Sequence, residues 1–325
     1  MKCISVKFIL LTILIFMQSC IKDDYSDCKE SALRLRFRYT LNNQYSDLFG
    51  SEVRQVTVYV FDADGKYVGH YSDSGEKLAT NYIMTIPLPK GDYRVIAICD
   101  NLNTFSAGWI DRNTNSFYSE FQPGVTVDSD FRVMLNTKEG AEGYLVPVSV
   151  PGEFYTGYVA GAPSTFDTSY ITDVDLMKDT KNIVVKISGL DFITRAMITP
   201  DVYITAVNGR YKNDNSIDDF HRMLKYTPHD SSVTGNTMDS YLKTMRLVTG
   251  HAPMLVIKKP SDPGYLFNQD ITQLILSTPK YTSQEDIDRE DTFVFEINFT
   301  QADNNIVISI LINGWKINTI IPIND

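Results

Sequence analysis

The sequence predicts an all-β protein made of two β-sandwich units in tandem. Apolar and polar residues alternate with period two, as in residues 33–41, which is typical of half-buried strands. Turn signals such as Asp62–Lys66 and Asn208-Gly209 separate these segments at short intervals, and no strand–helix rhythm of a parallel sheet appears. Composition agrees: 19 Tyr and 17 Phe favour pleated surfaces, and 325 residues suffice for two domains of roughly 100–200 residues.

The first unit is expected within residues 29–160. Its opening strand carries Leu33, Leu35 and Phe37 on one face and arginines on the other. Residues 53–61 are apolar at almost every position, which predicts a central strand covered on both faces. Further strands are expected at 66–71, 82–87, 93–99, 131–135 and 144–150. Residues 100–124 are polar and rich in Asn and Ser, so we expect a long loop there.

The second unit is expected within residues 161–325, after a junction in the Gly- and Pro-rich stretch 151–169. Residues 215–226 predict a short helix, because Ile217, Phe220 and Leu224 recur at three- and four-residue spacing. Residues 271–276 predict a strand, with a helix as the alternative. The other expected strands are 181–190, 202–207, 255–257, 293–299 and 306–312, followed by a strongly β-prone end at 315–323.

Residues 1–19 have the features of a lipoprotein signal peptide. Lys2 and Lys7 precede an apolar run of about ten residues, too short for a hydrocarbon core that needs about twenty. Ser19 before Cys20 resembles a lipobox, so we expect cleavage at that point and a covalent lipid on Cys20. An ordinary secretory signal with a later cut is the alternative. Residues 20–28 are then a lipidated tether.

The residues directly after Cys20 carry a second targeting signal. Lys22, Asp23 and Asp24 resemble the export signal that directs Bacteroidales-type lipoproteins to the cell surface. We therefore expect a lipid-anchored, surface-exposed position in the outer membrane. The net charge of −10 gives no attraction to anionic lipid, so the acyl chains would supply the membrane attachment. The same acidic balance argues against nucleic acid as a partner.

The sequence indicates neither an enzyme nor a metal site. Nucleophile elbows, phosphate-binding loops, dinucleotide fingerprints and zinc-binding helices are missing, and the four His are scattered. No cofactor is expected beyond the lipid on Cys20. After processing, Cys28 and Cys99 remain in an oxidising compartment. They are either a disulfide or two small apolar residues, and the sequence leaves both open.

Several motifs, taken in order, resemble the FimB-type anchor subunits (minor fimbrillins) of Bacteroidales-type, type V, fimbriae. The tether with its following Arg36–Tyr39 strand is similar to the start of that family, and Val58–Gly65 with the Pro89–Tyr93 turn is similar to its first domain. Ile183–Leu190 resembles the opening of the second domain, and Ile312–Trp315 the carboxy-terminal signature. The resemblance implies two transthyretin-like, Greek-key β-sandwich domains and a membrane-attached base of a fimbrium, with fimbrillin stalk subunits as partners.

The resemblance also implies contact by strand exchange, in which main-chain hydrogen bonds supply the affinity. Because the end of the chain is strongly β-prone, we expect the exchanged segment there. Its residues are Ile306, Ile308, Ile310, Ile312 and Trp315. The alternative is that this segment completes the sheet of its own domain.

Two other functions remain compatible with the sequence. A surface glycan-binding lipoprotein of a carbohydrate-uptake system would share the signal and the fold but would need exposed aromatic platforms, such as Trp109. A fimbrial tip adhesin would share the fold and would lose its first strand to a protease, whereas an anchor would keep it.

Overall fold

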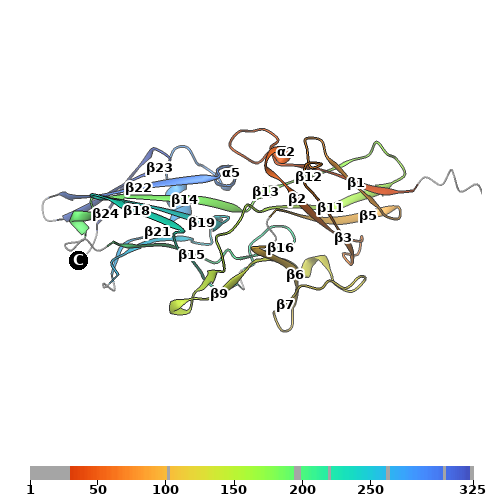
Figure 1. Cartoon of the computed structure of the whole chain (residues 1–325), viewed down its shortest axis with the longest axis horizontal. Helices are drawn as coiled ribbons and strands as arrows, with labels where there is room; N and C mark the ends of the chain where they lie inside the picture. Colours follow the sequence, from red (N-terminus) through yellow and green to blue (C-terminus); the bar gives the residue numbers. More distant parts are fainter. Residues whose placement is uncertain are drawn as a thin grey trace, which may run out of the picture.

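The computed structural model describes residues 30–100, 103–193, 199–218, 221–260, 264–302 and 305–322, with the backbone alone for 302, 305–306 and 318–322. The molecule is elongated (Figure 1), with β1 at one end and β18 and β24 towards the other. The all-β prediction is confirmed, because strands dominate the described residues and the helices are short.

An eight-stranded sheet forms most of the first half. Its main order is β12-β1-β11-β5-β2-β3, with β4 paired to β1 and β13 to β11. Its strands are β1 (Ala32–Arg38), β2 (Gln55–Phe61), β3 (Tyr67–Ser74), β4 (Ile83–Pro87), β5 (Gly91–Cys99), β11 (Tyr155–Thr165), β12 (Thr172–Asp175) and β13 (Met177–Lys178). The expectation that residues 53–61 are covered on both faces is confirmed: Val56, Val58 and Val60 lie in one core cluster and Tyr59 and Phe61 in another.

A four-stranded sheet in the order β16-β8-β6-β7 lies against the second face of β2 and β5. It contains β6 (Phe105–Asp111), β7 (Ser116–Tyr118), β8 (Phe131–Leu135) and β16 (Arg210–Lys212). The loop expected over residues 100–124 is therefore wrong, because β6 and β7 form a hairpin within it. The Asn- and Ser-rich composition concealed a strand whose Phe105 and Ile110 are buried. Tertiary packing here overrides local propensity.

Two six-stranded sheets form the second half. One has the order β21-β20-β15-β17-β10-β9 and the other β18-β19-β14-β22-β23-β24. The first contains β9 (Thr137–Glu139), β10 (Leu145–Pro147), β15 (Asp201–Ala206), β17 (Leu224–Tyr226), β20 (Met254–Lys258) and β21 (Tyr265–Asp270). The second contains β14 (Thr180–Ser188), β18 (Asp230–Thr234), β19 (Thr237–Met245), β22 (Thr292–Ala302), β23 (Asn305–Ile312) and β24 (Trp315–Pro322).

The helical segments are short and lie between strands. They are α2 (Phe49–Glu52), α3 (Leu190–Ile193), α4 (Ile271–Leu276), α5 (Gln284–Arg289) and the 3₁₀ turns η2 (Asp128–Asp130) and η3 (Ala141–Gly143). Of the two alternatives for residues 271–276, the structure has the helix. The side chain of Asp270 caps it by accepting from the main-chain N–H of Thr272 and Gln273.

The helix expected over residues 215–226 is wrong for the part of that range that the structure describes. Asn215 has a left-handed φ of 63°, Ile217 bridges to Tyr211, and β17 follows. The buried carboxylate of Asp218 pairs with two arginines from other strands. The long-range pairing explains why the apolar spacing was misleading.

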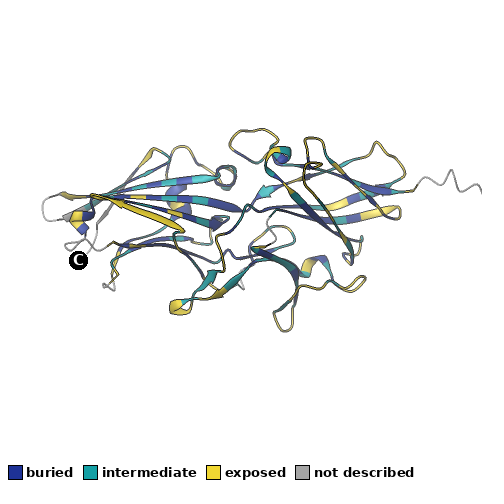
Figure 2. Cartoon of the chain, viewed as in Figure 1, coloured by how far each residue is buried: buried dark blue, intermediate teal, exposed yellow. Residues whose placement is uncertain are grey.

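The two halves share strands and core. The boundary expected between residues 160 and 161 falls inside β11. Strands β9 and β10 extend the sheet of the second half through β17, and β16 from the second half extends the sheet of β8. The larger core cluster contains Phe131 from the first half and Phe293 from the second. The chain passes from one half to the other at Asp179, between β13 and β14. Figure 2 shows the buried strands continuing across the middle of the molecule.

Candidate functional site

The expected lipid, export and tether residues lie outside the described part of the chain. Cys20, Lys22, Asp23, Asp24 and Cys28 all precede Glu30, where the description begins. The disulfide between Cys28 and Cys99 therefore stays a prediction. Cys99 itself is fully buried in β5, and this burial raises the pKa of its thiol well above the ordinary value. A raised pKa keeps the thiol protonated and unreactive.

The first strand is held on both sides. β1 pairs with β4 through Ala32–Arg36 and in parallel with β12 through Leu35–Arg38. Leu33, Leu35 and Phe37 of β1 are at most 2% exposed. β1 also pairs with β11 at Ala32 and Leu33, so removing this strand would open three ladders and the core beneath them.

The predicted strand-exchange segment lies in β23 and at the start of β24. β23 pairs with β22 on one side and with β24 on the other. Ile308, Ile310 and Ile312 are buried in the core of their own half, whereas Trp315 is 45% exposed. The backbone of Ile306 lies in β23, and its side chain is outside the described part. In this structure the segment completes its own sheet, with β24 outermost.

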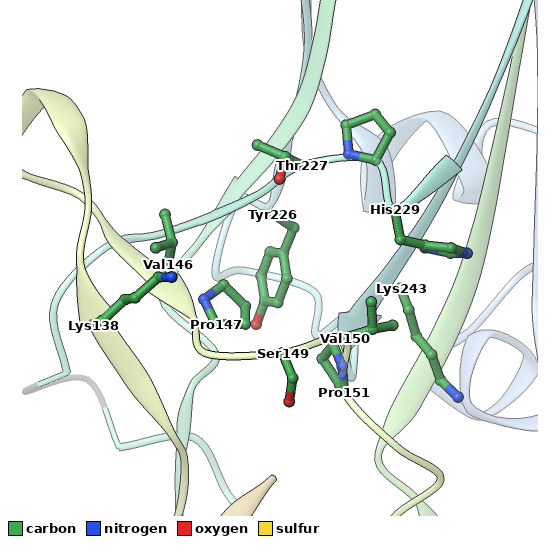
Figure 3. Close-up of a pocket in the computed structure, with 11 residues that line it drawn as sticks. Lys138, Val146, Pro147, Ser149, Val150, Pro151, Tyr226, Thr227, His229 and Lys243 are labelled. Carbon is green, nitrogen blue, oxygen red and sulfur yellow. The ribbon is translucent and has the colours of Figure 1, made fainter. Parts of the chain in front are cut away.

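The opposite edge of the same sheet is β18. Among the described strands it pairs with β19 alone, and all five of its residues are exposed. The chain that leads from β17 into β18 lines a cleft of about 360 Å³ together with Val146, Pro147 and residues 149–151 (Figure 3). Lys138 lies on one side of this cleft, His229 and Lys243 lie on the other, and the ring of Tyr226 lies between them.

A cluster of charges lies where the chain crosses between the halves. Lys178 Nζ is 3.0 Å from a Glu153 oxygen and 3.2 Å from an Asp291 oxygen. Burial alone would lower the pKa of Lys178, but Asp291, Glu153 and Glu52 outweigh it and raise that pKa. Tyr155 donates to Glu52 at 2.7 Å. These ion pairs tie the first sheet to the second half.

In the deepest part of this charge cluster Asp179 and Lys181 are fully buried, and the side chain of Arg246 is 12% exposed. Arg246 donates to both carboxylate oxygens of Asp288, at 2.7 and 2.6 Å. Lys181 donates to the main-chain oxygens of Asp288 and Glu290, and burial lowers its pKa to about 8. Asp179 accepts from Thr156 at 2.7 Å. Charged groups at this depth require partners, so the cluster fixes the junction in one arrangement.

A second contact between the halves joins the loop after β1 to the end of α5. Arg289 donates to the main-chain oxygens of Thr40 (3.1 Å) and Asn42 (3.4 Å), and its guanidinium lies 4.7 Å from the ring centre of Tyr45. Asn43 donates to Glu290 at 3.0 Å. We call these contacts the loop clasp.

Replacing Arg289 by alanine is expected to cost about 1–2 kcal/mol and to free the loop at residues 40–48, because two main-chain acceptors and a stacked ring lose their partner. Limited proteolysis should then cut this loop faster, with β1 still in place. Lys77→Ala, which removes an exposed partner of Asp73 in the same half, is the control. Equal cleavage of both variants would contradict a role for the clasp.

Within the described ranges, no group of three or more His, Cys, Asp or Glu side chains could hold a metal ion. No helix among those residues is long and apolar enough to cross a membrane.

Trp109, the aromatic platform of the glycan hypothesis, stacks on Tyr118 at 4.8 Å between ring centres. Its indole N–H donates to the Glu120 carbonyl.

No sequence motif predicted the cleft, the loop clasp or the charge cluster where the chain crosses between the halves, which we call the junction cluster. Asp179 and Asp288 are far apart along the chain, and no motif connects them. The one available signal was Lys181, a charge beside the apolar run of β14.

Three solved structures share the fold of this chain. A candidate polysaccharide-binding protein of Bacteroides thetaiotaomicron matches with 23% identity over 91% of this chain and 99% of that chain, at a TM-score of 0.70. A candidate adhesin of Bacteroides ovatus matches with 21% identity over 91% and 96%, at 0.73. The fimbrial anchor protein Mfa2 of Porphyromonas gingivalis matches with 19% identity over 88% and 98%, at 0.70.

These likenesses show that the chain shares an all-β sandwich fold with the three structures. The sequence model of the fimbrillin-A associated anchor proteins Mfa1 and Mfa2 matches residues 25–320. The chain therefore belongs to that family, and the predicted resemblance to fimbrial anchors is confirmed. The family is one of structural fimbrial proteins at the cell surface. Comparison with curated protein sequences gives no significant match.

Proposed function

We propose that this chain is an outer-membrane lipoprotein that anchors a fimbrium to the cell surface. The family match over residues 25–320 is the observation that carries this proposal. Acyl chains on Cys20 hold the protein in the outer membrane, and Lys22, Asp23 and Asp24 direct it to the outer face. The elongated shape supports this role, since β1 and the far edges of the second half lie towards opposite ends of the molecule (Figure 1).

Intact-mass spectrometry of protein extracted from membranes tests the tether. The expected mass is that of residues 20–325 plus acyl chains on Cys20, with β1 retained. Cys20→Ala is expected to abolish the added mass and to release the protein from the membrane, because this cysteine carries the only anchor proposed. An unacylated wild-type protein, or one that lacks β1, would contradict the proposal.

The proposed contact with a fimbrillin subunit is strand exchange through the β23–β24 hairpin, which carries Ile306, Ile308, Ile310, Ile312 and Trp315. Exchange would begin at β24, the outermost strand, because β23 is paired on both sides. Main-chain pairing along such an edge supplies affinity without a side-chain motif.

Deleting residues 315–325 is expected to detach fimbriae from cells while the anchor stays in the membrane. The deletion removes β24 and leaves β23 paired with β22. Fimbriae are counted on cells and in the medium, and thermal unfolding verifies that the shortened chain folds. Trp315→Ala serves as the control, because it keeps the β24 backbone. Full attachment by the deletion variant would reject exchange through this hairpin and leave the lipid anchor standing.

A second candidate function rests on the stacked pair of Trp109 and Tyr118. Tyr118 is 45% exposed, so the pair offers an aromatic surface of the kind that sugars bind. Binding of the purified chain to a glycan array, lost in Trp109→Ala, would favour the glycan-binding lipoprotein. A fimbrial tip adhesin would instead be found without β1.

A further inference from the structure

We propose that β18 and the cleft beside it form a docking surface for an extended, acidic segment of a partner subunit. The segment would add to the sheet as a new strand next to β18, and no strand of this chain would leave its own sheet. The inference deepens the proposed function by assigning a partner surface, and it rests on that function only for the identity of the partner as a fimbrial subunit.

The edge of β18 is unprotected. All five residues, Asp230–Thr234, are exposed, and Val233 is 51% exposed. Figure 2 shows the strand as a continuous exposed stripe. Natural sheets protect exposed edges with charged residues, especially Lys, with Pro or with bulges. β18 has one charged residue, Asp230 at its first position, contains neither Lys nor Pro, and keeps an unbroken register with β19. Its free main-chain groups can therefore pair with an added strand.

The cleft gives this edge a side-chain pocket. Residues 226–229 line the cleft and lead directly into β18, so a strand added along β18 would pass over the cleft when it continues beyond Asp230. Val146, Pro147, Val150, Pro151 and Pro228 form its apolar walls. Val150 is 48% exposed, and Val148 beside the cleft is 56% exposed. These exposed valines indicate an apolar contact that the chain alone does not cover.

The charge of the residues that line the cleft determines which kind of partner segment can bind there. In a chain of net charge −10, the ionisable residues that line this cleft, apart from Tyr226, are all basic: Lys138, His229 and Lys243. Lys243 Nζ also lies 2.5 Å from a carboxylate oxygen of Glu153, whereas Lys138, in β9, is exposed to solvent. Complementarity therefore favours a partner segment with acidic side chains between small apolar ones. A basic segment would meet charges of its own sign.

Photo-crosslinking in intact cells tests the surface. A photoreactive residue replaces Val233 in the full-length, membrane-bound chain. The matched control carries the same photoreactive residue in place of Val125, a valine of the first half that is 68% exposed. We expect an adduct at position 233 that maps to an extended segment of net negative charge. Lys138→Glu is expected to reduce this adduct about fivefold or more, whereas Lys90→Glu, an exposed lysine in a turn of the first half, leaves it unchanged.

The outcomes separate the two proposals. An adduct with a fimbrillin subunit supports both, and an adduct with an acidic strand of another protein supports the docking surface but not the anchor function. Cells that carry normal fimbriae and give no adduct above the Val125 control would overturn the docking surface and leave the anchor function standing. An adduct with lipid, with a second copy of this chain, or with a basic segment would also overturn it.

Discussion

Replacing Arg246 by alanine is expected to lower the free energy of unfolding by about 3–5 kcal/mol, because the change removes the ion-pair partner of a buried carboxylate. The side chain of Asp288 is 3% exposed and receives two hydrogen bonds from Arg246. Asp179, fully buried next to them, also loses the nearby positive charge. Chemical denaturation of the wild-type chain and the variant measures the difference.

Two further variants make this test specific. Arg222→Ala removes an arginine that binds Glu139 through the same two-pronged geometry, but on the surface. It is expected to leave stability unchanged within error, since water and salt screen that pair. Combining Arg246→Ala with Asp288→Ala should cost less than the sum of the single changes, because neither charge is then buried alone. Additive losses, or equal losses for Arg246 and Arg222, would contradict the role of burial.

Much of the fold could be predicted from local sequence because strands carry their own pattern. β1 alternates from Leu33 onwards, and β2 is apolar at nearly every position because both of its faces are covered. β6 and residues 215–226 could not be predicted correctly. Their conformations depend on partners far along the chain, Phe131 for β6 and Arg132, which pairs with Asp218, for the turn.

A single sequence leads to a site prediction only where the chemistry follows one short segment. The lipid, export and tether residues form such a segment at the start of the chain, and they stay predictions because they lie outside the described residues. The junction cluster joins residues as distant as Asp179 and Asp288, and the cleft joins β9, β10, β17 and β19. Sheet topology brings these residues together, and a single sequence does not encode that topology in any local motif.

Two buried groups of the second half titrate over the same pH interval. Burial raises the pKa of Asp179 from 3.8 to about 6, although Arg246, Thr156 and Asn215 act in the opposite direction. Burial, followed by the charge of Arg210, lowers the pKa of His221 from 6.5 to about 4. Each shift makes the stability of the fold depend on pH.

The two dependences have opposite signs. Between about pH 4 and pH 6 the folded chain keeps a proton on Asp179 that the unfolded chain has released, so raising the pH lowers stability. Between about pH 4 and pH 6.5 the unfolded chain holds a proton on His221 that the folded chain lacks, so raising the pH increases stability. In the wild-type chain these two contributions oppose each other.

In a variant that lacks one of these two groups, the change of folding stability with pH should therefore follow the other group. We expect the stability of Asp179→Asn to rise with pH between about pH 4.5 and pH 6, and that of His221→Gln to fall, each with a slope approaching about 1.4 kcal/mol per pH unit. Urea unfolding at several pH values in this window measures both slopes. Near pH 4.5, the ordinary glutamate pKa, carboxylates with lowered pKa values, such as Glu153, also make stability rise with pH. Each variant's slope is therefore compared with the wild-type slope, which contains the same contribution: the difference should be positive for Asp179→Asn and negative for His221→Gln. Differences of the same sign in both variants would show that Asp179 and His221 do not control the pH dependence of the fold.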